Sequence, residues 1–158
     1  MSDDGDAVEG SSAIERLQQS LYRSLPIYEH IGITVGALGS IVRCRIPLNH
    51  GNGNHFGAVH AALQFAVMEL AGGLAVGQCE ALRSGDFLLV VKRFSIDFLK
   101  PAMTDLEAVA TIGNEQLREI DRNLRVKGKH AFKLEISLIN DVQEVVAFAI
   151  GEYYARQK

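Results

Sequence analysis

Hydrophobic and polar positions alternate through much of the chain, as they do in strands that bury one face. Elsewhere, apolar residues recur every three or four positions, which is the spacing of an amphipathic helix. The alternation predicts strands over residues 31–35, 40–46, 87–100, 104–112, 130–140 and 144–154. The helical spacing predicts helices over residues 13–25 and 114–126, and Pro26 is expected to close the first of them.

Residues 58–77 form the longest apolar segment, and this segment is apolar on nearly all sides. A helix with that pattern is expected to be buried rather than half exposed. The segment before it, 49–57, is dense in Asn and Gly and is therefore expected to be a loop. One long buried helix among largely antiparallel strands predicts an α+β hotdog fold, in which a curved antiparallel sheet wraps around a central helix.

The chain length of 158 residues is enough for one domain with a sizeable core. Residues 1–12 lack apolar periodicity and concentrate Asp, Gly and Ser, so they are expected to be a flexible acidic leader. Residues 13–158 are expected to form the single hotdog domain.

Composition excludes several classes of partner and location. The chain has 16 basic and 19 acidic residues, and this near balance gives no support to a nucleic acid or an anionic membrane as partner. No run approaches about 20 apolar residues, the length of a membrane span. The first residues lack the basic start and apolar run of a secretory signal, and Cys44 and Cys79 are too few for a disulfide framework. The expected location is the cytoplasm.

Glu69 is the candidate for acid–base chemistry. It lies in the apolar segment between Met68 and Leu70, where an unpaired carboxylate is costly. Desolvation there would raise its pKa toward the range that a general base needs. The alternative is a carboxylate that reaches the surface or caps a neighbouring loop. Gln64 is a second polar residue of the same segment.

His60 is expected at the start of the buried helix. There its ring can bind the loop, and the free backbone N–H groups of Ala61 and Ala62 can face a substrate oxygen. The alternative role of His60 is to cap the helix or brace the loop. Asn54 would ordinarily be a turn residue. His50 and His55 suggest a metal together with His60, but their spacing matches no ligand set, so no metal and no cofactor are expected.

Two segments resemble a known family. The run Asn54–Ala62, followed by Glu69 and Ala71, is similar to the N-x-x-G-x-x-H-G-G…D/E-x-A signature of PaaI-like hotdog acyl-CoA thioesterases. The run Phe94–Ala102 resembles that family's strand ending in Y-L-x-P-A, and the match covers about residues 30–155. The most similar subgroup is that of the poorly characterised thioesterase-like hotdog proteins. Ala61-Ala62 stands where the family has Gly-Gly, and Glu69 where Asp is commoner.

This resemblance implies roles for individual residues. Glu69 would activate water, Asn54 would position substrate or water, and the N–H of Ala61 would polarise the thioester carbonyl, with His60 as a brace. Gly57, in the same motif, and Gln64 are candidate substrate-binding residues. The family assembles its site across a dimer interface, so the resemblance implies a homodimer or a tetramer built of dimers.

Basic residues gather in and after the predicted helix 114–126. Arg122, Arg125 and Lys127 are candidates to bind the phosphates of coenzyme A, because guanidinium and ammonium groups suit phosphate. The alternative is a solvated helix face balanced by nearby acidic residues.

The expected function is hydrolysis of an acyl-CoA thioester, with coenzyme A entering only as part of the substrate. The sequence leaves two alternatives open. One is a hotdog protein that binds an acyl group or acyl-CoA without turning it over. The other is a different hotdog reaction, such as dehydration of a hydroxyacyl thioester.

Overall fold

The computed structural model describes residues 4–158, with side chains described from Ala13 onward. In chain order its elements are α1 (Asp4–Ser24), α2 (Pro26–His30), β1 (Thr34–Ala37), β2 (Ile41–Ile46), α3 (Ala61–Val76), α4 (Glu80–Arg83), β3 (Phe87–Phe98), β4 (Leu106–Thr111), α5 (Asn114–Lys127), β5 (Lys129–Ile139) and β6 (Val145–Gln157). The strands form one antiparallel sheet in the order β1-β2-β4-β5-β6-β3.

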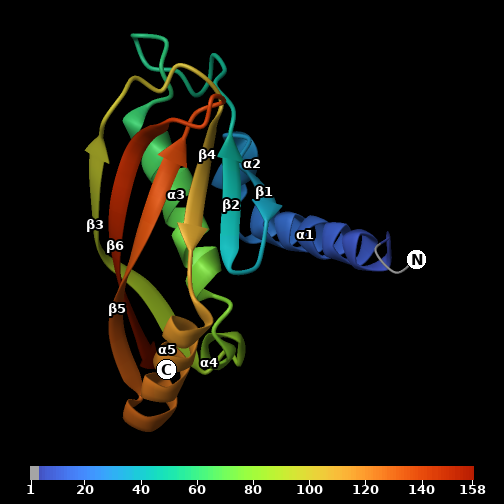
Figure 1. The fold of residues 1–158 in the computed structure, drawn as a ribbon, viewed down its shortest axis with the longest axis vertical. Coiled ribbons are helices and arrows are strands. Elements are labelled where there is room, and N and C mark those ends of the chain that lie inside the picture. The colour runs from blue at the N-terminus through green and yellow to red at the C-terminus, as the bar shows by residue number, and fades with distance from the viewer. Residues whose placement is uncertain (1–3) are drawn as a thin grey trace.

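Helix α3 lies along one face of this sheet, where Figure 1 shows it running behind β4, β5 and β6. Its residues Val67, Met68, Ala71 and Ala75 recur at helical spacing and are fully buried. They pack mainly against β2, β4 and β5. A sheet wrapped over one long buried helix is the hotdog fold, and the fold predicted from the sequence is confirmed.

Small side chains on the strands allow this close packing. Five alanines on β4 and β6 are completely buried: Ala108, Ala110, Ala147, Ala149 and Ala155. Larger aliphatic side chains fill the space between them, as interior packing at high density requires. Buried and more exposed residues alternate along β4 and β6, and the buried ones lie on the side of the sheet that faces the core.

The two ends of the molecule differ. At one end, the loop before α3 meets the segment between β3 and β4, where Val59 N–H donates to the Ala102 carbonyl at 2.9 Å. At the opposite end lie α4 and α5 (Figure 1). Helix α5 ends at Gly128, whose φ of 69° is the left-handed conformation that favours glycine at a C-cap.

The N-terminal segment departs from the expected boundaries. Helix α1 ends at Ser24, just before Pro26 as expected, and Pro26 itself begins a second helix, α2, because proline is favoured at the first turn of a helix. The strand expected over 31–35 is β1, which begins later, after a turn at Gly32 with φ 71°. Helix α1 begins at Asp4 and takes in most of the segment expected as a leader; residues 1–3 lie outside the described residues. Within the described chain no helix is long and apolar enough to cross a bilayer.

Candidate active site

Glu69 lies in the middle of α3 and is the only acidic residue of that helix. Its chain neighbours Met68 and Leu70 are buried, and Glu69 itself is half-buried. Desolvation raises the pKa of the Glu69 carboxyl above its ordinary value. A raised pKa brings a carboxyl closer to the neutral range in which a general base works. The candidate base therefore has the surroundings that its proposed chemistry needs.

The hydroxyl of Tyr28 binds this carboxylate. It donates a hydrogen bond to Glu69 Oε2 at 3.3 Å, across 41 positions of sequence. That bond lowers the pKa of Glu69 and partly offsets the larger effect of desolvation. Burial, and then the charge of Glu69, raise the pKa of Tyr28 to about 12, so Tyr28 stays protonated at neutral pH. Nothing in the local sequence of α2 marks Tyr28 for this contact.

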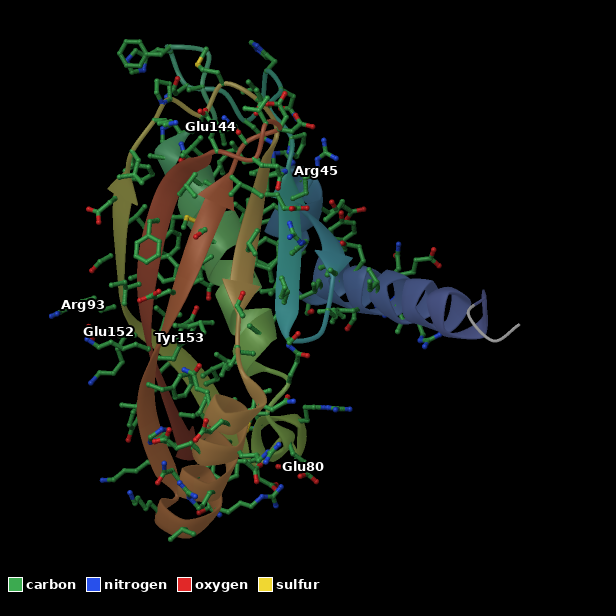
Figure 2. All side chains as sticks on the ribbon, viewed as in Figure 1. Arg45, Glu80, Arg93, Glu144, Glu152 and Tyr153 are labelled. Atoms are coloured by element: carbon green, nitrogen blue, oxygen red, sulfur yellow. The ribbon has the colours of Figure 1, made fainter. Side chains whose placement is uncertain are left out.

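Tyr153 of β6, labelled in Figure 2, carries a second hydroxyl that lies close enough to Glu69 to feel its charge. Burial and the charge of Glu69 raise its pKa. The Tyr153 side chain is buried, and its hydroxyl has no hydrogen-bond partner among the described residues. It lies directly against Gly72, one turn after Glu69 on α3, at a point where any Cβ would overlap it. Only a glycine at position 72 leaves room for the Tyr153 ring.

His60 is the N-cap of α3. Its Nδ1 accepts a hydrogen bond from Ala62 N–H at 3.1 Å. The structure therefore places His60 in its alternative role as a capping residue. It also corrects the expectation for Ala62, whose N–H is held by this cap and does not face a substrate. The N–H of Ala61 has no acceptor among the described residues and lies at an exposed position.

Asn54 and Gly57 form the turn before α3. Asn54 Oδ1 accepts hydrogen bonds from Phe56 N–H at 2.9 Å and Ala58 N–H at 3.1 Å. Gly57 has φ 77°, the left-handed region that other residues rarely adopt. Both residues therefore hold the loop in shape within one protomer, and the Asn54 side-chain amide NH₂ is the part of Asn54 left without a protein acceptor in the described chain.

Gln64 connects the loop to α3. It is buried, and its Nε2 donates to the Val59 carbonyl at 2.8 Å. Its Oε1 has no partner among the described residues, which is uncommon for a buried amide oxygen. Oε1 therefore keeps its full capacity to accept a hydrogen bond.

Asn52 is a structural residue of this loop that the sequence analysis did not single out. Its side chain is buried, and its Nδ2 donates to the carbonyls of Ile31 at 2.8 Å and Pro47 at 2.9 Å. It thereby ties the loop to the chain on both sides of the first hairpin. Within a run rich in Asn, no sequence feature distinguishes the buried one from its exposed neighbours.

The candidate residues do not converge within one protomer. The nine residues from His60 to Glu69 correspond to a rise of about 13 Å along the helix. Ala61 and the Asn54 turn lie at the start of α3, whereas Glu69 lies near its middle. Among the clefts lined by described residues, the ones at α4 and α5, at β4 and the turn before β6, at β5, and on α1 contain none of Glu69, Asn54 or His60.

The basic residues lie at the opposite end. Arg125 binds Asp121 at 2.7 Å and Glu80 at 3.5 Å, so its guanidinium is already paired. Arg122 and Lys127 are exposed on the same helix, α5. Figure 2 places Glu80 at this end of the molecule and Glu144, next to the loop end of the sheet, at the other. One protomer therefore does not bring Arg122, Arg125 and Lys127 to the start of α3.

The described residues hold no group of three or more His, Cys, Asp or Glu side chains that could bind a metal ion. The His55 ring packs against the Phe56 ring at a tilt, with centroids 3.8 Å apart, on the exposed tip of the loop. His60 is occupied by its capping bond. These histidines are part of the loop and of its junction with α3.

Comparison with known proteins identifies the family of this chain. Residues 15–151 match the model of a family described as a domain of unknown function, DUF4442. The chain belongs to the DUF4442 family. No curated protein matches the DUF4442 chain in a sequence search.

Solved structures with the same fold cover nearly the whole DUF4442 chain. A Pseudomonas aeruginosa protein of unknown function, described as a probable thioesterase, is 27% identical with a TM-score of 0.80, covering 91% of this chain and 95% of that chain. A Haemophilus influenzae thioesterase is 19% identical with a TM-score of 0.70, covering 91% and 90%. A Chlorobaculum tepidum protein of unknown function is 18% identical with a TM-score of 0.80, covering 94% and 97%. The DUF4442 chain thus resembles hotdog thioesterases along its length.

Proposed function

We propose that this protein hydrolyses acyl-CoA thioesters, with Glu69 as the general base. The observation that carries the proposal is a half-buried carboxylate of raised pKa in the central helix of a fold shared with thioesterases. Glu69 takes a proton from a water molecule as the water oxygen attacks the thioester carbonyl carbon. The tetrahedral intermediate then collapses, the C–S bond breaks, and the proton passes from Glu69 to the leaving thiolate.

The start of α3 supplies the group that stabilises the oxyanion in this proposal. The N–H of Ala61 is free of protein acceptors in the described chain and lies at the positive end of a helix of 16 residues. A backbone donor aimed at the developing oxyanion lowers the barrier of acyl transfer. Ala61 is too far along the helix from Glu69 to serve the same carbonyl, so the proposed site combines groups of two protomers.

The free edge of β3 supports this dimer. β3 has 12 residues and pairs only with β6, whereas β1 at the other edge has four residues and a bulge. A long open edge with apolar side chains is a surface for strand pairing. Phe98 and Leu99 are more than half exposed at the end of β3, and Phe65 of α3, 40% exposed, contacts Phe94 edge-on at 5.1 Å between ring centroids.

A second copy at this edge would cover Glu69 as well. Phe65 and Glu69 lie four residues apart on α3 and therefore share a face of the helix. We expect the two copies of β3 to pair through the residues that follow the bulge between Val91 and Arg93, up to the end of the strand at Phe98. Figure 2 shows Arg93 pointing away from the sheet at this bulge.

Antiparallel pairing also gives the basic residues a place in the proposal. A two-fold axis that pairs β3 with itself reverses the long axis of the second copy. The partner's α5 then comes to the end of the dimer at which this chain's α3 begins. Arg122 and Lys127, exposed and without an ion pair among the described residues, are the proposed phosphate contacts for coenzyme A.

Variants of a structural neighbour support the pairing of Asn54 with Glu69. The solved structures of a Staphylococcus aureus protein, called a thioesterase enzyme in one case, include one variant with a glutamine and one with a glutamate replaced by alanine. Those two positions are 15 residues apart, as are Asn54 and Glu69. An amide side chain and a carboxylate at that separation match the proposed site.

A thiol-release assay over short, long and aromatic acyl-CoAs tests the proposal. Glu69→Gln keeps the size of the side chain but removes the base, so turnover should fall by at least about 100-fold, the lower end of what a positioned base contributes. Glu29→Gln is the matched control, because Glu29 is an exposed acid of α2 beside the same region. Wild-type turnover by Glu69→Gln would refute the mechanism.

One observation favours a second function, binding of acyl-CoA without hydrolysis. The hydrogen-bond acceptor of Asn54 and the N–H of Ala62 are both engaged within the protomer. Fewer free groups then remain to act on a thioester. Tight binding of acyl-CoA with no thiol release by the wild-type protein would establish this alternative.

A further inference from the structure

Tyr28 is fixed in place by its backbone as well as by packing. It lies in α2, the short helix that Pro26 begins. Its N–H donates to the Leu25 carbonyl at 3.1 Å, and its carbonyl accepts from Ile33 N–H at 2.9 Å. The side chain is half-buried against the core. A residue held at both backbone groups presents its hydroxyl at a defined point.

The hydroxyl meets only one of the two oxygens of Glu69. It donates to Oε2 at 3.3 Å, and Oε1 has no hydrogen bond within the described residues. Because the phenol remains protonated, it acts toward Glu69 as a donor and not as a second anion. A carboxylate fixed at one oxygen keeps a defined direction for the lone pairs of the other.

We propose that Tyr28 is a positioning residue for Glu69, holding Oε2 so that Oε1 faces the attacking water and keeping the carboxylate ionised in its half-buried setting. The part of this inference that concerns the water rests on the proposed function. The part that concerns the charge of Glu69 rests on the contact itself.

The other titratable groups around Glu69 cannot replace Tyr28. Tyr153 of β6 influences Glu69 electrostatically but makes no hydrogen bond to it. Cys44 of β2, which lies near Tyr28, is buried, and burial raises the pKa of its thiol to about 12, so it stays neutral. None of these groups is a cation. Tyr28 is therefore the group that favours the charged form of Glu69 within the described residues.

The sign of the expected effect follows from this arrangement. A hydrogen bond to the ionised form lowers a carboxyl pKa, so removing the Tyr28 hydroxyl raises the pKa of Glu69 further. In Tyr28→Phe, the acidic limb of the kcat–pH profile should move to higher pH. On that limb kcat should fall about tenfold, the size expected for losing one hydrogen bond to a charged group, and it should recover as the pH rises.

Tyr22→Phe is the matched control. The Tyr22 hydroxyl donates to the Ile33 carbonyl at 2.8 Å, so it fastens the same N-terminal helices to the first hairpin without touching Glu69. If Tyr28 acted only through stability, both variants would lower activity at every pH without moving the limb. That result would overturn the inference.

A measurement without turnover separates this inference from the proposed function. The titration of Glu69 is followed by carbon NMR of protein labelled at the glutamate carboxyl carbons, with the Glu69 signal assigned by its loss in Glu69→Gln. Tyr28→Phe should move this titration to higher pH, and Tyr22→Phe should not. An unmoved titration in Tyr28→Phe refutes the inference even if the wild type releases thiol. A moved titration with no thiol release refutes the proposed function and leaves the role of Tyr28 in the charge of Glu69 standing.

Discussion

Polar side chains interrupt the apolar interior around α3 at a few single residues. Gln64, Glu69 and Tyr153 each place a polar group among buried neighbours, and two of them, Gln64 Oε1 and the Tyr153 hydroxyl, have no protein partner in the described chain. Each such group costs free energy of folding unless it is satisfied. All three groups lie on α3 or on β6. Because they do not favour folding, their presence there indicates a functional site in this part of the interior.

At Gly72 this interior has no room for a larger side chain. In Gly72→Ala the new methyl group overlaps the Tyr153 hydroxyl and closely approaches Ile136, so the free energy of unfolding should fall by about 1–3 kcal/mol, as for other overpacked cores. Tyr153→Phe removes the overlapping atom and should restore part of that loss in the double variant. The measurement is urea unfolding of both single variants and the double variant.

The matched control for this cycle is Gly73→Ala. A Cβ at position 73 meets no neighbouring atom, and alanine favours helix, so this variant should be as stable as the wild type or more so. Equal destabilisation at positions 72 and 73 would show that the contact with Tyr153 is not the cause.

At the scale of elements, α3 depends on the residue that precedes it. Its first turn contains no acidic residue, and its N-cap is a histidine ring. His60→Ala removes the acceptor for Ala62 N–H and should lower the free energy of unfolding by about 1 kcal/mol. His60→Asn supplies another capping acceptor and should restore most of it. A His60→Ala protein with unchanged urea stability would contradict the capping role.

The elements in the second half of the chain could be predicted because their buried residues recur with the regular spacing of a strand or a helix. Strands β3 to β6 and helix α5 lie within a few residues of the predicted ranges, and Gly128 ends α5 as a glycine C-cap does. The sequence predicts the end of α1 before Pro26 but not the short helix α2, because Pro26 both stops one helix and starts another, which spacing alone does not decide.

The candidate site could be predicted only in part, for a physical reason. Glu69 stands out locally, since one acid in an apolar helix is visible in the sequence. Its partner Tyr28 is 41 positions away, and the contact exists only once α2 has docked beside α3. Asn54 and His60 belong to a motif that is visible in the sequence, but their bonds within the loop depend on turn geometry that residue types do not specify.

At the scale of the whole molecule, the open edge of β3 determines assembly. Light scattering of the wild type should give about twice the 17.3 kDa mass of the chain, or four times if dimers pair again. Phe98→Lys places a charge on the proposed interface and should shift the protein toward 17.3 kDa while lowering thioesterase turnover with it.

Val126→Lys serves as the control for assembly. Val126 is 76% exposed on α5, away from the β3 edge, so a charge there should leave the mass unchanged. A wild-type protein of 17.3 kDa at working concentration, or a monomeric Phe98→Lys that keeps full turnover, would rule out a site shared between two copies.

The order of strands has a consequence for synthesis. β3 is the third of six strands in chain order, yet its sole neighbour in the sheet is β6, the last of them. While the ribosome is still building residues 99–157, β3 has no strand to pair with, and its core-packing residues Leu89, Val91 and Phe94 lie on an unpaired strand. A nascent chain stalled before β6 would therefore expose both edges of this strand at once, and loss of the C-terminal strand should yield an aggregating product rather than a smaller folded one.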